Sequence, residues 1–319
     1  MRLMTLQDLA RVNPIANRHW LSAVDRATSM WLRMPGSIQI DIEGPMPTGE
    51  RPMIYACNHT HSLDFLPVRY AMYQRGQEWC TWIKPRAYLS RVQSILFANT
   101  GNIPMVSRGY LLAADFQQLI GRKPTQDEYL TLREHIDHGA RLDCSSIFEA
   151  LRSTDRDMLG RNFESSRESY SYAIHQLFSE MMTATLKIAK RAIAAGRHMQ
   201  IYPQGTVSHR LTRARTGVVQ AAAALDLPIV PVAISGVPQA LAGGLRRKGG
   251  RIVIRFGSPI RVRAPQGFQA FNADHERRAA RMLELRAADL TFAIDRLLDA
   301  PHRISREVDA PRATVARFL

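Results

Sequence analysis

Apolar residues gather in short runs that are separated by longer segments with helical spacing. Short runs rich in β-branched or aromatic residues, and bounded by glycine, proline or polar residues, are typical of strands. Such runs occupy residues 37–42, 53–57, 79–83, 103–106, 199–202, 229–234 and 251–256. Because helical segments separate many of them, the pattern predicts an α/β fold, with a layered sheet and flanking helices.

The N-terminal segment, residues 1–36, carries an amphipathic helical pattern. Apolar side chains recur there at helical spacing, at Trp20, Val24, Ala27, Trp31 and Met34, and arginines fall between them, at Arg18, Arg26 and Arg33. Such a stripe suits a helix that packs on the core. It also suits a helix that lies at a membrane interface, where Trp and Arg are common. The sequence leaves both interpretations open.

Residues 110–197 are predicted to form a helical insertion between two strands of the sheet. The segment is polar and rich in helix-favouring residues, and the apolar spacing near its end predicts a long helix over residues 169–195. Another helix is predicted over residues 274–298. We expect one domain over residues 37–300 that includes the insertion, followed by a basic tail at residues 301–319.

The charge balance changes the list of expected partners. Lys and Arg number 43 against 28 Asp and Glu, which gives a formal net charge of +15. This surplus favours polyanionic partners, such as anionic lipid headgroups or nucleic acid. The positive residues are spread along the chain, and the sequence has neither a zinc-finger spacing nor a ribonucleoprotein-like aromatic motif. We therefore expect an anionic membrane surface as a partner, and no nucleic acid.

Three features bear on the expected location. Cys57, Cys80 and Cys144 make neither a CxxC pair nor a disulfide framework, which is typical of a reducing compartment. The N-terminus carries charge where a secretory signal needs an apolar run. Prolines and glycines interrupt the longest uncharged stretch, Leu227 to Leu245, so no membrane-spanning helix is predicted. The expected location is cytoplasmic, peripheral at the inner face of the membrane.

A candidate catalytic pair follows the strand at residues 53–57. His59 and Asp64 stand five positions apart, in the segment Asn-His-Thr-His-Ser-Leu-Asp. An aspartate that accepts the Nδ1 proton of a histidine fixes the tautomer of the ring, which leaves Nε2 free to take a proton from a hydroxyl. His59 is therefore a candidate general base with Asp64 as its partner. No protein nucleophile is required, because a substrate hydroxyl can attack.

Two further strands end in residues that suit substrate binding. The segment from Gly101 to Arg108 delivers an arginine to a strand end, and the segment from Ile201 to Ser208 delivers a Gly-Thr turn. The apolar strand at residues 229–234 comes next. The occurrence of these segments in this order is far more specific than any one of them.

Together these segments, over roughly residues 37–260, resemble the glycerolipid acyltransferases of the lysophosphatidic acid acyltransferase family. The resemblance implies transfer of a fatty acyl group from acyl-CoA or an acyl carrier protein to a hydroxyl of a lysolipid, with no cofactor and no metal. It makes His59 the base and Asp64 its partner. It also implies that the substrate is bound by Arg108, Gln204, Gly205 and Thr206, with the Arg108 guanidinium on the phosphate of the acceptor.

The third segment departs from the family pattern, which usually reads Pro-Glu-Gly-Thr-Arg-Ser. Here Gln204 replaces the acid and Val207 replaces the arginine. An expected cation is therefore missing near the acceptor site. Replacement charge is available nearby, from His209, Arg210, Arg213 or Arg215. The insertion at residues 110–197 is a second departure, which can reshape the acyl or acceptor pocket.

Other functions remain as alternatives. The same fold can bind lipid without turnover, or the same base can serve an acceptor that is not a phosphoglyceride. The spacing of His59, His61 and Asp64 resembles part of a metallo-hydrolase motif, but no distant ligand set accompanies it. Cys57 lies two positions before His59 and is either a nucleophile or, as is usual for cysteine, a small buried residue.

Overall fold

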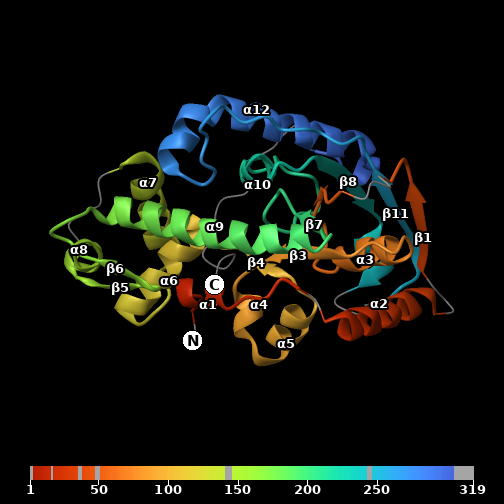
Figure 1. Cartoon of the computed structure of the whole chain (residues 1–319), viewed down its shortest axis with the longest axis horizontal. Helices are drawn as coiled ribbons and strands as arrows, with labels where there is room; N and C mark the ends of the chain where they lie inside the picture. The colour runs from red at the N-terminus through yellow and green to blue at the C-terminus, as the bar shows by residue number, and fades with distance from the viewer. Residues whose placement is uncertain are drawn as a thin grey trace.

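A seven-stranded mixed sheet forms the centre of the protein in a computed structural model, which describes residues 3–15, 17–34, 38–46, 51–140, 146–242 and 246–304 (Figure 1). The strand order is β1-β11-β8-β2-β7-β3-β4. These strands are β1 (Ile38–Glu43), β2 (Ile54–Cys57), β3 (Trp79–Ile83), β4 (Ile103–Pro104), β7 (His198–Ile201), β8 (Ile229–Ser235) and β11 (Gly250–Phe256).

Strand direction decides where the ends of the strands meet. β8, β2, β7, β3 and β4 run parallel to one another, whereas β11 is antiparallel to β8 and β1 is parallel to β11. The carboxyl ends of β2, β7, β3 and β4 therefore lie at one edge of the sheet. Ligand sites of open α/β sheets commonly form at this edge.

Helices cover both faces of the sheet. Alternate residues of β2 point to opposite faces, so Ile54 and Ala56 join one core, while Tyr55 and Cys57 join the other. The first core also contains α1 (Leu6–Ala10), α6 (Arg108–Ile120), α9 (Tyr170–Ala194), α10 (Gly217–Leu225) and α12 (Ala273–Leu297). The second core contains α2 (Arg18–Arg33), α3 (Phe65–Tyr73) and α11 (Val237–Ala240). The layered α/β fold predicted from the sequence is confirmed.

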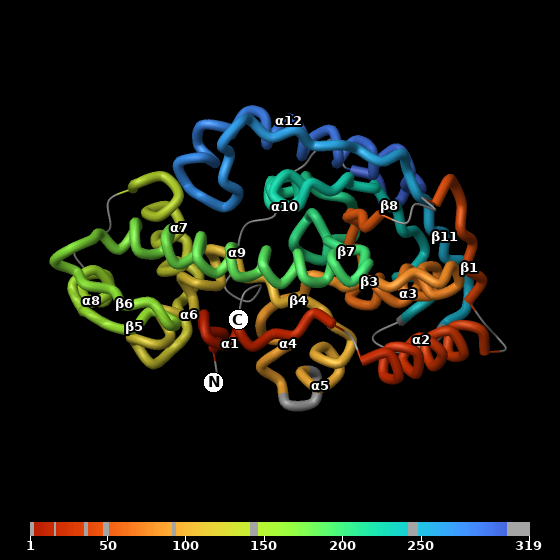
Figure 2. The backbone as a smooth tube through the Cα atoms, in the orientation of Figure 1, coloured from red at the N-terminus to blue at the C-terminus, as the bar shows by residue number. Residues whose placement is uncertain are grey.

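The segment between β4 and β7 extends the first core to the end of the molecule farthest from β1 (Figure 2). It consists of α6, α7 (Gln126–His138), α8 (Ser146–Ser153), a hairpin of β5 (Arg156–Met158) and β6 (Arg161–Phe163), and α9. A buried ion pair between Arg156 and Asp115 ties the hairpin to α6, at 2.7 Å. The long helix α9 then returns the chain to the sheet.

The remaining elements are short. They are α4 (Arg86–Leu89), α5 (Arg91–Asn99), the pair β9 (Leu241–Ala242) and β10 (Arg246–Arg247), and a 3₁₀ turn at Ala300–His302. The predicted basic tail lies outside the described residues from position 305 onward. Among the described residues, no helix is both long enough and apolar enough to cross a membrane.

The buried face of α2 coincides only in part with the predicted apolar stripe. The buried residues are Leu21, Thr28, Ser29 and Leu32; within the stripe, Val24 and Trp31 are half-buried, and Trp20, Ala27 and Met34 are exposed. The buried side also carries Asp25, which pairs with Arg69 of α3 at 2.5 Å. This ion pair and Leu32 orient the helix, so its Trp20 edge faces away from the core.

Candidate functional site

The turn after β2 places a histidine at the carboxyl edge of the sheet. Its first residue, Asn58, is fully buried and forms two hydrogen bonds with the backbone of Ile234 in β8: its Nδ2 donates to the carbonyl at 2.9 Å, and its Oδ1 accepts from the amide at 2.6 Å. These bonds fix the start of the turn to the neighbouring strand. The position of His59 is therefore set by the sheet rather than by a loose loop.

The structure brings His59 and Asp64 together. The Nδ1 atom of His59 lies 3.2 Å from Oδ2 of Asp64. The same carboxylate oxygen accepts the backbone amides of Thr60 at 2.6 Å and His61 at 2.8 Å, and Asp64 is completely buried. A carboxylate held by so many donors is a fixed acceptor for a protonated Nδ1. This tautomer leaves Nε2 as the basic nitrogen of the ring.

His59 lines a cavity of about 290 Å³ whose walls are mainly apolar. The walls come from α2, α3, β3, α5 and β7, and include Phe65, Leu66, Trp82, Leu96, Phe97 and Tyr202. Its lining includes His59 and Gly205, at the carboxyl edge of the sheet, and Trp79 at the opposite end of β3. At a rise of about 3.3 Å per residue, β3 itself spans about 13 Å. The cavity can receive a narrow apolar chain that ends next to His59.

The turn after β7 supports the His59 backbone. Gln204 is buried, and its Oε1 accepts the amide of His59 at 2.8 Å. Its Nε2 donates to the carbonyl of Arg210 at 3.4 Å and to Oγ1 of Thr212 at 3.3 Å. Both ends of the carboxamide are thus used inside the protein, which makes Gln204 a support for the His59 turn, and its predicted contact with substrate stays a prediction. A glutamate carboxylate at this position could not donate the two bonds to Arg210 and Thr212.

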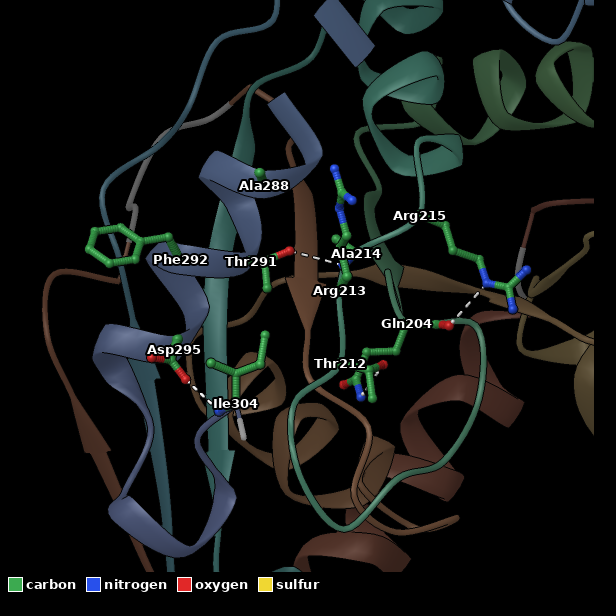
Figure 3. Close-up of a pocket in the computed structure, with 10 residues that line it drawn as sticks. All are labelled: Gln204, Thr212, Arg213, Ala214, Arg215, Ala288, Thr291, Phe292, Asp295 and Ile304. Atoms are coloured by element: carbon green, nitrogen blue, oxygen red, sulfur yellow. Dashed lines mark hydrogen bonds between the residues drawn. The ribbon is translucent and has the colours of Figure 1, made fainter. Parts of the chain in front are cut away.

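Gly205 brings an arginine to the same turn. Its φ of +71° lies in the left-handed region, and a Cβ at this position would come 3.1 Å from Nε of Arg215. The Arg215 Nε also donates to the carbonyl of Gln204 at 3.2 Å, as Figure 3 shows. Of the cations that were candidates to replace the missing arginine, Arg215 is therefore the one that lies against this turn. Thr206 is buried next to it, and Val207 is exposed.

A second cavity, of about 660 Å³, lies on the other side of Gln204, between the loop that follows the turn and α12 (Figure 3). Arg213 and Phe292 line it, and the loop is attached to the helix by a bond from the Ala214 amide to Oγ1 of Thr291 at 2.9 Å. His59 does not line this larger cavity. We therefore place the candidate chemistry in the smaller one.

Arg108 is not brought to His59. It begins α6 and forms an ion pair with Glu276 of α12, while its guanidinium carbon lies 4.6 Å from the ring centre of Phe178. It is not among the residues that line the His59 cavity. The phosphate-binding role predicted for Arg108 would require this pair to open. That role stays a prediction.

Burial argues against a thiol nucleophile. It raises the pKa of the Cys57 thiol to about 12, so the group is a neutral thiol near pH 7.

His61 uses its Nδ1 to accept the amide of Leu63 at 3.2 Å, within the turn itself. Among the described residues, no group of three or more His, Cys, Asp or Glu side chains is arranged to hold a metal ion.

Two residues of the site were missed in the sequence. The ring of Tyr202 stacks on His59 with centroids 4.1 Å apart and planes 23° apart. Gln200, in the middle of β7, donates from Nε2 to the Tyr202 hydroxyl at 3.0 Å. The available signal was a glutamine inside an apolar strand, directly before the Gly205 turn. A buried carboxamide needs partners, and these partners lead to the histidine.

Comparison with known proteins gives a family match over part of the chain and a distant structural likeness. Residues 165–235 match the model of the family described as Acyltransferase. A crystal structure of the 1-acyl-sn-glycerophosphate (LPA) acyltransferase, PlsC, from Thermotoga maritima is similar at 12% identity, with a TM-score of 0.43, over 86% of this chain and 84% of that chain. The search among curated proteins gave no match.

The matched segment begins after His59 and Asp64, so it leaves the candidate pair outside. It contains strands β7 and β8, the Gln204 turn and Tyr202. Those are the parts of the site that hold the His59 turn in place. The similarity to the Acyltransferase model is therefore a similarity of these supporting elements.

Proposed function

We propose that the protein transfers a fatty acyl group from an acyl thioester, either acyl-CoA or acyl carrier protein, to a hydroxyl of a lysophospholipid or related lipid. The observation that carries the proposal is the His59–Asp64 pair at one end of an apolar cavity. A base at this place can reach a lipid hydroxyl, while the cavity takes up an acyl chain. The family match favours acyl transfer over other base-catalysed reactions.

The proposed reaction needs no covalent acyl-enzyme. Nε2 of His59 removes the proton of the acceptor hydroxyl as its oxygen attacks the thioester carbonyl, and Asp64 stabilises the imidazolium that forms. The tetrahedral intermediate then collapses to the ester. The C–S bond breaks, and the leaving thiolate takes the proton from His59. The Gly205 amide already donates to the Tyr202 carbonyl at 3.0 Å, so the backbone amide of Thr206 is the candidate in this turn for stabilising the developing oxyanion.

The cavity suits the acyl chain of the donor or product. Each methylene that leaves water for such an apolar space contributes about 0.8 kcal/mol. Trp79 stands at the far end from His59 and would limit the length of the chain. We therefore expect a selective optimum in chain length, with longer chains disfavoured because they meet this indole.

For the acceptor, we propose a lipid that carries a phosphate. Arg215 lines the larger neighbouring cavity and places its Nε against the Gly205 turn, and Gly205 itself lines the cavity of His59. A guanidinium is well suited to a phosphate because it can donate two parallel hydrogen bonds. Arg108 stays a second candidate for this contact, on the condition that it leaves Glu276.

We also propose that the protein binds the surface of an anionic membrane. Exposed apolar side chains occur on α2, where Trp20 is 46%, Met30 70% and Met34 45% exposed, and on α5, at Ile95 and Leu96. The two helices are joined by a hydrogen bond from the Asn17 amide to the Asn99 carbonyl at 2.9 Å, and residues of both line the His59 cavity. Arginines flank the α2 side chains, at Arg18, Arg26 and Arg33. A bilayer on this face would adjoin the cavity that takes up the lipid.

Product analysis tests the enzyme proposal. The protein is incubated with mixed lysolipids and a labelled acyl thioester, and the lipid products are identified by mass spectrometry. We expect labelled diacyl products from wild type and from His138→Ala, an exposed histidine of α7, but none above background from His59→Ala. Turnover by His59→Ala equal to that of wild type would refute the role of His59 as the general base.

One alternative is a lipid-binding protein of the same fold that lacks turnover, which the changes at Gln204 and Val207 favour. It predicts vesicle binding without product over a wide acceptor panel. An acceptor without phosphate is a further alternative, and it predicts labelled product from neutral glycolipid or amino-lipid acceptors only. The same product analysis separates these outcomes.

A further inference from the structure

A fully buried glutamine occupies the centre of the sheet. Gln200 lies in β7 between β2 and β3, and its whole side chain is excluded from solvent. A carboxamide in such a place is unfavourable by about 1–3 kcal/mol unless its atoms are hydrogen-bonded. An aliphatic residue would be the simpler choice for an inner strand. Packing alone therefore does not explain a glutamine at this position.

Its bonds link two strands to the candidate base. Oε1 of Gln200 accepts the hydroxyl of Thr81 in β3 at 3.0 Å, and Nε2 donates to the Tyr202 hydroxyl at 3.0 Å. Gln200 and Tyr202 are two positions apart on extended chain, so their side chains point to the same side. The tip of the tyrosine is thus fixed from within the sheet.

The face of the tyrosine ring lies on the imidazole. The His59 and Tyr202 rings are stacked with centroids 4.1 Å apart. Burial raises the pKa of Tyr202 well above its ordinary value, so the phenol stays neutral and does not act as an acid or base near pH 7. Its hydroxyl is also directed to Gln200, away from a substrate. What the ring offers to His59 is a flat, fixed surface.

We infer that Tyr202, anchored by Gln200, is a positioning residue for His59, an inference that rests on the function proposed above. The bond to Asp64 fixes the imidazole within its own plane but permits the ring to tilt about the Nδ1–Oδ2 direction. The stack on Tyr202 opposes that tilt. Together the two contacts define the direction of Nε2, and thus the place where an acceptor hydroxyl must lie.

Three variants separate the ring from its anchor. Tyr202→Leu removes the stack, Tyr202→Phe keeps the ring and removes the anchoring bond, and Gln200→Leu removes the anchor from the other side. Tyr172→Leu, at an exposed tyrosine of α9, is the matched control. A misplaced catalytic group costs up to about 100-fold in rate, so we expect kcat to fall about 10- to 100-fold in Tyr202→Leu with little change in KM. Tyr202→Phe should recover most of that loss, and Gln200→Leu should resemble Tyr202→Phe.

An NMR measurement tests the geometry without turnover. The Tyr202 ring should shift the carbon-bound protons of the His59 imidazole upfield, and this shift should persist in Tyr202→Phe and vanish in Tyr202→Leu. The His59 signals are assigned from their absence in His59→Gln. Wild-type kcat in Tyr202→Leu, a loss confined to KM, or an imidazole shift unchanged in Tyr202→Leu would each overturn the inference.

These readouts also separate this inference from the proposed function. If wild type makes no acylated lipid but the imidazole shift depends on Tyr202, the proposed reaction fails and the positioning contact stands. If wild type is active and neither kcat nor the shift responds to Tyr202→Leu, the positioning role fails and the reaction stands. Circular dichroism and thermal unfolding of each variant exclude loss of fold as the cause of a lower kcat.

Discussion

Two turns at the same edge of the sheet, after β2 and after β4, carry the residues with the most obvious chemistry, yet they use them differently. His59 follows β2, is paired with a buried carboxylate and opens on a cavity. Arg108 follows β4 and is paired with Glu276 of a distant helix. Both side chains are fixed by an acidic partner, but of the two only His59 lines the apolar cavity. Position at a strand end thus does not by itself determine what a residue can do; the partners of its side chain also matter.

The largest expected effect concerns the partner of His59. Asp64→Asn keeps the size of the side chain and an oxygen that can accept the Nδ1 proton, but it removes the negative charge that stabilises the imidazolium. We expect kcat/KM for acyl transfer to fall by about 10²–10⁴-fold. The matched control is Asp226→Asn, at an exposed left-handed position that asparagine tolerates, which should leave the rate unchanged. A loss of less than threefold would remove the distinction between the two turns.

The second effect decides which arginine meets the acceptor. We expect Arg215→Gln to raise KM for a phosphorylated lysolipid by about 10- to 100-fold, because hydrogen bonds to charged groups contribute about 1.5–3 kcal/mol. KM for an acceptor without phosphate should change little. Arg108→Met should leave both values within about threefold of wild type. The reverse order in steady-state kinetics would mean that Arg108 leaves Glu276 when the acceptor binds.

His198 begins β7, at the end of the strand opposite to the Gln204 turn, and it makes the free energy of unfolding depend on pH. Burial lowers its pKa from 6.5 to about 4, and its Nδ1 accepts the amide of Met53 at 3.2 Å, which requires a neutral ring. The unfolded chain binds a proton below pH 6.5 and the folded protein does not, so stability falls as the pH drops from 6.5 toward 4. The expected loss between pH 7 and pH 5 is about 2 kcal/mol from this residue.

Urea unfolding at the two pH values measures this loss. A His198→Asn variant, which can still accept the amide, should lose about 2 kcal/mol less than wild type over the same interval. An equal loss in both proteins would assign the pH dependence to other groups. Unlike His59, this histidine is kept from solvent and from substrate, so its substitution should affect kcat only through stability.

The smallest effect tests the Arg108 pair itself. Glu276→Gln keeps the bond from Gln220 in reach but removes the charge that holds Arg108. For a half-buried pair we expect a loss of about 1 kcal/mol in the free energy of unfolding, with no loss of acyl transfer. Glu149→Gln, which opens an exposed pair with Arg152, should change neither quantity. A gain in affinity for phosphorylated acceptor in Glu276→Gln would show that the pair competes with substrate.

Much of the fold could be predicted because strands and helices impose regular spacing on apolar residues. The predicted helices over residues 169–195 and 274–298 correspond to α9 and α12 within one residue at each end. His59 and Asp64 could also be paired in advance, since a short turn keeps residues five positions apart within reach. These predictions depend on local geometry, which the sequence contains directly.

What the sequence could not predict concerns contacts between distant segments. The buried face of α2 depends on Arg69 and Leu32, and Arg108 is held by a residue far along the chain. The role of Tyr202 depends on the same kind of contact, because its stack on His59 joins the residue after β7 to the turn after β2. The spacing of apolar residues along the chain does not show which distant segments meet. Such contacts can be predicted only when the topology of the sheet is known.

The bonds that fix Asn58 to Ile234 and His59 to Gln204 have a consequence for the order of synthesis. A ribosome makes the base early in translation, but the residues that secure it come some 145 and 176 positions later. The emerging N-terminal part has the histidine without its supports. The histidine can thus gain both supports only once β8 has been made and has inserted next to β2.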